Sequence, residues 1–202
     1  FREGEWAEDT EGALWTLEGL DAHRIAMGRV PDLVRVVVAV DPSGTSGGHD
    51  STADDVGIVV AGLGVDGRWY VLADHSCNLS PAGWGRRAVD AYREWNADRI
   101  VAEVNFGGAM VRHVIKSVDA SVPFKEVRAS RGKIARAEPI SALYEEGKIS
   151  HVGTHPDLED QMCAMTSKGF IGEGSPDRAD ALVWAITELS GKSKREPGVR
   201  RL

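Results

Sequence analysis

The sequence has little cysteine, no long apolar run and no excess of positive charge, and each absence excludes a class of protein. Its two cysteines, Cys77 and Cys163, lie far apart, so we expect both to be reduced rather than part of a disulfide or a metal site, which fits a cytoplasmic setting. No stretch approaches the roughly 20 apolar residues of a membrane-spanning helix, and no signal peptide is visible. A net charge of −7 argues against a simple nucleic-acid coat protein.

The composition that is present is that of an ordinary folded protein. Hydrophobic residues make up 42% of the 202 residues and charged residues 27%, which is enough for one sizeable core. The chain begins with Phe1 rather than Met, so we expect it to be part of a longer protein.

We expect three regions. They are a polar arm or linker at 1–32 with a short docked segment anchored by Trp15, a core domain at 33–190, and a frayed basic tail at 191–202.

Apolar runs and turn signals predict the order of strands and helices in the core domain. Strands are expected at 34–41, 56–63, 68–74, 99–104, 124–128 and 149–152. Helices are expected at 81–95, 108–118, 133–146, 156–165 and 177–189. Pro139 lies inside the third of these helices, so we expect a kink or a break there. A meander of three strands followed by alternating strands and helices indicates an α/β fold with a mixed sheet flanked by helices.

Three of these elements carry a carboxylate at an end. Asp41 follows the buried apolar run at 36–40, and Glu103 ends the strand that begins near residue 99. Asp177 and Asp180 open the last helix, three residues apart, so they can share one face of it. An ionised carboxylate at the end of a buried strand is costly unless it is paired or holds a metal. Carboxylates delivered by separate elements suit hard ions such as magnesium or manganese.

Acids on the first strand, the fourth strand and the last helix are typical of the ribonuclease H-like arrangement, in which those two strands are neighbours. Within that superfold, the chain resembles the C-terminal nuclease domain of the large terminase subunit of tailed bacteriophages. The resemblance rests on segments that match in order and spacing. They are residues 11–15, 38–42, 101–111, 131–133, 136–144 and 175–184.

The resemblance implies a DNA endonuclease that cuts concatemeric viral DNA during genome packaging, in the host cytoplasm. It implies hydrolysis assisted by two Mg²⁺ or Mn²⁺ ions. Asp41 would bridge both ions, Glu103 would be the second acid, and Asp177 or Asp180 would be the third. We favour Asp177 as the direct ligand because it lies at the helix start. The implied partners are double-stranded DNA, an upstream ATPase domain of the same polypeptide, the portal and the small terminase subunit. The resemblance does not imply binding to a membrane.

The segment at 125–136 carries five basic residues and one acid, whereas residues 1–32 carry three bases and eight acids. For charge runs in general a solvated face is the usual explanation, but a basic loop near an acidic centre also suits the DNA backbone. We expect DNA contacts from Arg128, Arg131, Lys133 and Arg136. Gly107 and Gly108 either let backbone amides approach a DNA phosphate or simply form a tight turn.

Tryptophans and histidines outside the acidic cluster are expected to be structural. Trp84, Trp95 and Trp184 fall at helical positions among apolar neighbours, so we expect them in the core rather than stacked on bases. His151 and His155 are four residues apart, but Gly153 lies between them and Pro156 follows, which argues against one helix and a zinc site.

Two other classes of function stay open. One is a resolvase, integrase or transposase of the same superfold, since a fold alone does not fix an activity. The other is a catalytically silent docking module for the portal or the small subunit. An ATPase activity of this chain is not expected, because Gly191-Lys192-Ser193 resembles the end of a phosphate-binding loop but Ile186 stands where that motif needs glycine.

Overall fold

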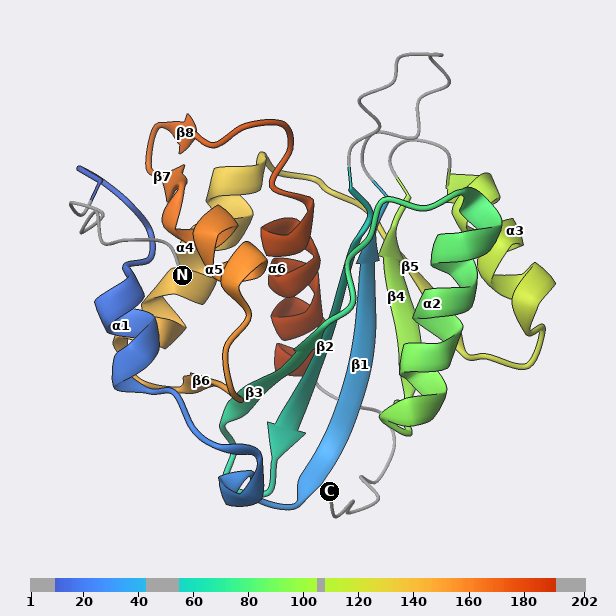
Figure 1. The fold of residues 1–202 in the computed structure, drawn as a ribbon, viewed down its shortest axis with the longest axis horizontal. Coiled ribbons are helices and arrows are strands. Elements are labelled where there is room, and N and C mark those ends of the chain that lie inside the picture. Colours follow the sequence, from blue (N-terminus) through green and yellow to red (C-terminus); the bar gives the residue numbers. More distant parts are fainter. Residues whose placement is uncertain (1–9, 43–54, 105–107, 192–202) are drawn as a thin grey trace, which may run out of the picture.

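The computed structural model describes residues 10–42, 55–104 and 108–191, in which a mixed six-stranded sheet lies between two groups of helices (Figure 1). The sheet strands are β1 (Leu33–Asp41), β2 (Gly57–Gly64), β3 (Trp69–Asp74), β4 (Arg99–Glu103), β5 (Phe124–Val127) and β6 (Ile149–His151). A small hairpin adds β7 (Met165–Thr166) and β8 (Gly169–Phe170). The helices are α1 (Leu17–Ala22), the short 3₁₀ helix η1 (Met27–Arg29), α2 (Pro81–Glu94), α3 (Gly108–Val118), α4 (Lys133–Glu145), α5 (Pro156–Cys163) and α6 (Asp177–Ser190).

The strand order β5-β4-β1-β2-β3-β6 confirms the predicted mixed α/β sheet. β1, β2 and β3 pair antiparallel as a meander, while β4, β5 and β6 add in parallel to their neighbours. β1 and β4 are neighbours, with Val40 opposite Ala102. The next residue on each strand is therefore an acid, and Asp41 and Glu103 end at the same edge of the sheet.

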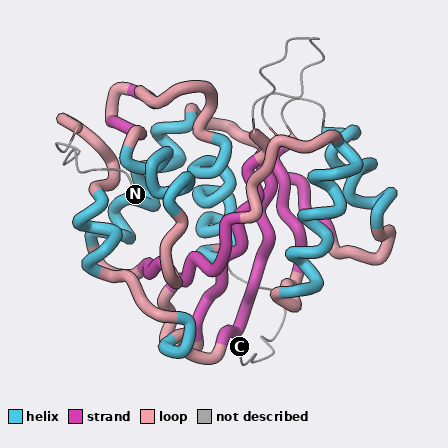
Figure 2. The backbone as a smooth tube through the Cα atoms, in the orientation of Figure 1, coloured by secondary structure: helices cyan, strands magenta, loops and turns pink. Residues whose placement is uncertain are grey.

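The two faces of the sheet bury different residues, because side chains alternate along a strand. Val36, Val38 and Val40 of β1 face the core that α2 and α3 cover. Val37 and Ala39 face the core that α4, α5 and α6 cover. Figure 2 shows these two helical groups on opposite sides of the strands. Asp41 lies two residues after Ala39 and four after Val37, so its side chain lies on the same face of the sheet, which α6 covers.

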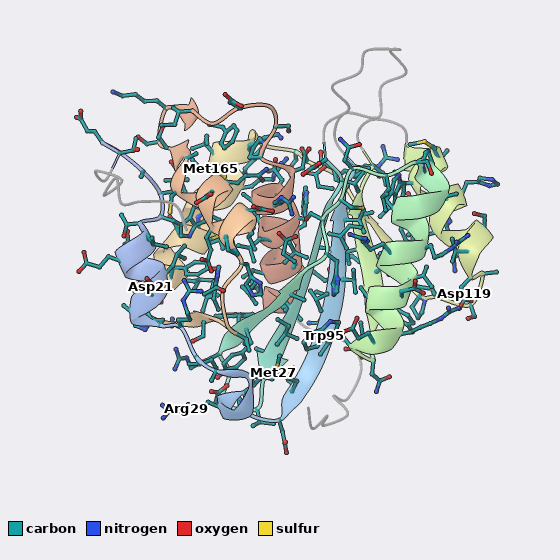
Figure 3. All side chains as sticks on the ribbon, in the orientation of Figure 1. Asp21, Met27, Arg29, Trp95, Asp119 and Met165 are labelled. Atoms are coloured by element: carbon teal, nitrogen blue, oxygen red, sulfur yellow. The ribbon has the colours of Figure 1, made fainter. Side chains whose placement is uncertain are left out.

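The part of the arm around Trp15 and Leu20 docks against this second core. Trp15 is buried, and its ring meets the ring of Tyr144 of α4 edge-on at 6.1 Å between centroids. Leu14 N–H donates to the carbonyl of Met165, a buried residue labelled in Figure 3. Arg24 binds both carboxylate oxygens of Glu159 at 2.7 and 3.1 Å. The described part of the arm is thus anchored by an aromatic contact, backbone hydrogen bonds and an ion pair with Glu159. The helix α1 within it and the hairpin β7–β8 were not predicted.

The expected helices and strands of the core appear with ends shifted by one or two residues, with one correction. α4 runs without interruption from Lys133 to Glu145, so of the predicted kink or break at Pro139 the break does not occur. A proline inside a helix removes the hydrogen bond to the carbonyl four residues earlier, here that of Ala135. Both residues lie on the exposed side of α4, which keeps that carbonyl out of the core. Among the described residues, no helix has the length and apolar character needed to cross a membrane.

Candidate metal centre

Four carboxylates gather where β1 and β4 end and α6 begins. Asp41, Asp177 and Asp180 are almost fully buried, with 3%, 0% and 1% of their surface exposed. Glu103 is more open, with a side chain 16% exposed. Val101 of β4 faces the α6 side of the sheet, so Glu103, two residues later, faces it too. All four sequence-predicted acids therefore lie on one side of the sheet at one edge.

Gly57 is a residue that the sequence interpretation missed, and it sets the position of α6. It lies opposite Asp41 in the β1–β2 ladder. A β-carbon at this position would lie 1.9 Å from the carbonyl oxygen of Asp177 and 3.1 Å from the β-carbon of Ala181. Because glycine has no β-carbon, the first turn of α6 can rest on the strand beside Asp41. A glycine inside a strand was the available signal, since it often marks close approach of another backbone.

Two side chains fix the start of α6. Gln161 of α5 accepts hydrogen bonds at its Oε1 from the N–H groups of Arg178, at 2.9 Å, and Ala179, at 3.4 Å. It thereby satisfies donors that a helix start leaves without partners. Arg178 binds Asp74 at the end of β3 at 2.8 Å and Asp55 at 2.9 Å. No sequence signal pointed to either residue, because both act across elements distant in the chain.

The acids strongly affect one another's protonation. Burial, together with the nearby carboxylates of Asp180, Glu103 and Asp177, raises the pKa of Asp41 to about 8, against the opposing effect of Lys133. In neutral solution the metal-free cluster therefore holds a proton on Asp41. Burial lowers the pKa of Lys133, but the attraction of Asp180, Asp41 and Asp177 outweighs this and raises it.

Two cations from the start of α4 point into the cluster. Lys133 Nζ lies 2.5 Å from Asp180 Oδ2 and donates to Ser175 Oγ at 3.0 Å. Arg136 lies 3.3 Å from Asp180 Oδ1 and 3.5 Å from Glu103 Oε2. Trp184 Nε1 also donates to Glu103 Oε2, at 2.8 Å. The structure thus brings Lys133 and Arg136, which the sequence suggested as DNA contacts, onto the acids themselves.

The donor set fits a hard divalent ion, because it consists of carboxylate oxygens from three elements. Within the described ranges, however, no three Asp, Glu, His or Cys side chains stand close enough together to enclose one ion. Lys133 and Arg136 contact carboxylate oxygens of Asp180 and Glu103 that would be available to such an ion.

The other predicted DNA contacts are distributed differently. Arg128 and Arg131 are exposed on the connection between β5 and α4. Gly108 is the first residue of α3, and Gly107 lies outside the described residues. Lys125 of the same basic segment lies 2.5 Å from the carboxylate of buried Glu188, so it serves the fold. The buried position of Trp184 matches its expected place in the core.

A mixed sheet in this strand order, with acids at the ends of β1 and β4 and at the start of α6, defines a ribonuclease H-like protein. The model of the terminase RNaseH-like domain family matches residues 38–189, which is most of the chain. The chain belongs to this family. The resemblance to phage large-terminase nuclease domains that the sequence suggested is thereby confirmed.

Solved structures of phage terminases share the fold. The nuclease domain of the P22 large terminase superposes with a TM-score of 0.64 at 14% identity, covering 90% of this chain and 95% of that chain. The large terminase nuclease from thermophilic phage G20c with bound magnesium gives 0.59 at 15% identity, covering 89% and 98%. The HK97 bacteriophage large terminase gives 0.63 at 11% identity, covering 87% of this chain and 43% of that chain. A comparison with curated proteins finds no match.

Proposed function

We propose that this chain is a divalent-metal-dependent endonuclease that cuts concatemeric viral DNA during genome packaging. The observation that carries the proposal is the buried cluster of Asp41, Asp177 and Asp180 with Glu103, drawn from three elements of the fold. Membership of the terminase family supports the DNA substrate. The G20c nuclease, solved with bound magnesium and with bound cobalt, supports divalent ions as the cofactor.

The four acids would hold the ions, with Asp41 between them. When bound, a pair of divalent ions activates a water molecule and stabilises the leaving 3′ oxygen of a phosphodiester. Asp41 must lose its proton to become a ligand, so ion binding should release protons from the cluster. The packing of Gly57 against α6 would keep Asp177 at a fixed height above Asp41.

The side chains of Lys133 and Arg136 would have two positions, one paired with the acids and one contacting DNA. Without an ion they neutralise Asp180 and Glu103. If the acids held an ion instead, Lys133 and Arg136 would no longer be needed to neutralise them and could contact DNA phosphates. This exchange reconciles their inward position with a role in holding DNA. Arg128 and Arg131, exposed beside them, would hold the backbone further out.

Membership of the family supports a proposal about the wider assembly. We propose that residues 33–190 are the nuclease domain and that residues 1–32 lead from an upstream ATPase domain, since this chain covers 43% of the HK97 large terminase. Residues 191–202 would be a tail, and all but the first of them lie outside the described residues. The portal and the small terminase subunit would be its partners in the host cytoplasm.

The test is cleavage of supercoiled plasmid by this chain with Mg²⁺ or Mn²⁺. We expect cleavage by the wild type, none with EDTA, and none by Asp41→Asn. Asp90→Asn, on the exposed face of α2 away from the acids, is the matched control and should cleave normally. Equal cleavage by Asp41→Asn and the wild type would refute the proposed centre. Cleavage confined to branched DNA would indicate a resolvase, and no cleavage with either ion would indicate a docking module.

A further inference from the structure

A pocket of about 580 Å³ lies between α4 and α6, directly beside the acidic cluster. Its walls combine two kinds of side chain. The apolar part includes Trp69, Ile140, Leu143 and Trp184. The cationic part consists of Arg128, Arg131 and Arg136. A volume of this size is within the range of small-ligand sites, roughly 300–1,000 Å³.

The pocket and the acidic cluster share two side chains. The guanidinium of Arg136 lies 4.8 Å from the ring centroid of Trp184, and the same group lies 3.3 Å from Asp180. Trp184 in turn donates its Nε1 hydrogen bond to Glu103. A group bound in the pocket would therefore lie against two side chains that themselves contact the acids. This proximity links the pocket to the substrate of the acidic centre.

The charge of the pocket limits the kinds of molecule that could bind in it. Among the described residues, no carboxylate pairs with Arg128 or Arg131, whereas Lys125, Lys133 and Arg136 all have acidic partners. An apolar peptide would use the walls and leave these two arginines unmatched. A free phosphate would neutralise the arginines but leave the apolar walls exposed to water. A nucleotide supplies a flat apolar base and an anionic phosphate together, and bases stack on aromatic side chains and on guanidinium planes.

We propose that this pocket takes one unpaired nucleotide of the DNA strand next to the cleaved phosphodiester. Its base would lie against Trp69, Leu143 and the side of Trp184 that lines the pocket, and its phosphate would contact Arg128 and Arg131. The inference rests on the proposed function, because it assumes that DNA is the substrate of the neighbouring acids. It extends that function by giving the protein a contact with a base, in addition to contacts with the backbone.

The test compares two DNA duplexes that differ at one position. One carries a single unpaired nucleotide, and the other carries an abasic unit there; both are titrated against the chain in EDTA so that no cleavage occurs. We expect the wild type to bind the base-bearing duplex about tenfold more tightly, equivalent to about 1.4 kcal/mol. Stacking of one base on aromatic side chains commonly contributes at least that much.

Thr187→Trp is the blocking variant, because Thr187 is exposed on α6 and lines the pocket without contacting the acids. It should abolish the tenfold preference and leave binding of the abasic duplex unchanged. Ser117→Trp, at an exposed position of α3 on the opposite face of the sheet, is the matched control and should keep the preference. Thermal melting of both variants checks that they fold.

Equal affinity of the wild type for the two duplexes would overturn the proposal and point to another occupant, such as an apolar side chain of a protein partner. A full preference retained by folded Thr187→Trp would also overturn it. If Thr187→Trp does not fold, the wild-type comparison decides alone. Plasmid cleavage with Mg²⁺ separates the two hypotheses: cleavage without a base preference refutes only the pocket, whereas no cleavage refutes the nuclease itself.

Discussion

Gly57 lies directly beneath Asp177: a β-carbon at residue 57 would lie 1.9 Å from the Asp177 carbonyl oxygen and 2.5 Å from its carbonyl carbon. These are backbone atoms, which cannot rotate away as a long side chain can. The acid-bearing turn of α6 therefore depends on a strand residue 120 positions earlier that carries no functional group of its own.

Gly57→Ala should force α6 away from β2 and lower both stability and cleavage. Overpacking of a tight core commonly costs about 1–3 kcal/mol, and in a chain of this size each kcal/mol lowers the melting temperature by roughly 2–4 °C. Cleavage should fall more than stability alone explains, because Asp177 moves relative to Asp41. Gly28→Ala is the control, since a β-carbon there meets nothing within 4 Å. Identical melting and cleavage for the two variants would contradict this role of Gly57.

Asp41→Asn should change how stability depends on pH in metal-free buffer. The pKa of Asp41 is about 8 in the folded protein and about 3.9 when unfolded, so the folded state binds the proton more tightly. The stability that this group contributes is therefore complete below about pH 4, falls by up to about 1.4 kcal/mol per pH unit, and is lost above pH 8. Asparagine does not titrate, so the variant should gain stability over the wild type as pH rises.

The measurement is urea unfolding with EDTA between pH 5 and 8, for the wild type, Asp41→Asn and Asp90→Asn. Asp90 is exposed on α2 and serves as the control for removal of one carboxylate. The difference between Asp41→Asn and the wild type should widen with pH, and that for Asp90→Asn should stay nearly constant. Parallel curves for all three proteins would show that Asp41 ionises normally.

The positions of Asp41 and Glu103 were predictable because they depend only on the residues of their own strands. Buried strands read as apolar runs, and alternation along each strand sends both acids to the side of Val37 and Val101. The inward turn of Lys133 and Arg136 was not predictable, because it depends on how α4 crosses α6. A basic segment alone is equally compatible with a solvated face.

Short elements such as β7, β8 and α1 also could not be predicted from local sequence patterns. The strands β7 and β8 have two residues each, too few for any periodicity. The helix α1 has six residues and is held by Thr16 at its start and by burial of Leu20, rather than by a long apolar stripe. The helix does not break at Pro139, because the penalty of a proline inside a helix falls when the affected carbonyl lies on the exposed side.

Manganese should raise the melting temperature of the wild type, and Glu103→Gln should reduce that rise. A ligand that binds only the folded state stabilises it by about 2.7 kcal/mol at a hundred times its dissociation constant. Glutamine keeps the size of the side chain and its capacity to accept the Trp184 hydrogen bond, but it is a poorer ligand. Glu126→Gln, on neighbouring β5 and exposed, is the control. An equal rise in all three proteins would place the ion elsewhere.

Lys133→Ala should have opposite effects on stability and on ion binding. Removing one partner of a buried ion pair costs about 3–5 kcal/mol; because the Lys133 side chain is 40% exposed, we expect a smaller decrease of about 1–2 kcal/mol in EDTA. Manganese should nevertheless bind several-fold more tightly by calorimetry, since a competing positive charge is gone. Lys148→Ala, whose lysine pairs with Glu146 at the surface, is the control. Weaker manganese binding by Lys133→Ala would mean that the lysine assists the ion rather than competing with it.

The double variant Arg128→Ala and Arg131→Ala should weaken DNA binding and make it less sensitive to salt. Both side chains are exposed beside the acidic cluster, and losing the one DNA phosphate that they would contact together should reduce the slope of log affinity against log salt by about 0.9. Fluorescence titration of a duplex at several salt concentrations in EDTA gives this slope, and manganese binding should not change, because neither arginine touches the acids. Arg86→Ala with Arg87→Ala removes the same charge from the exposed side of α2 on the opposite face of the sheet, and it should leave the slope nearly unaltered. If both double variants lower the slope equally, the arginines act only through net charge, and the DNA does not lie along the connection between β5 and α4.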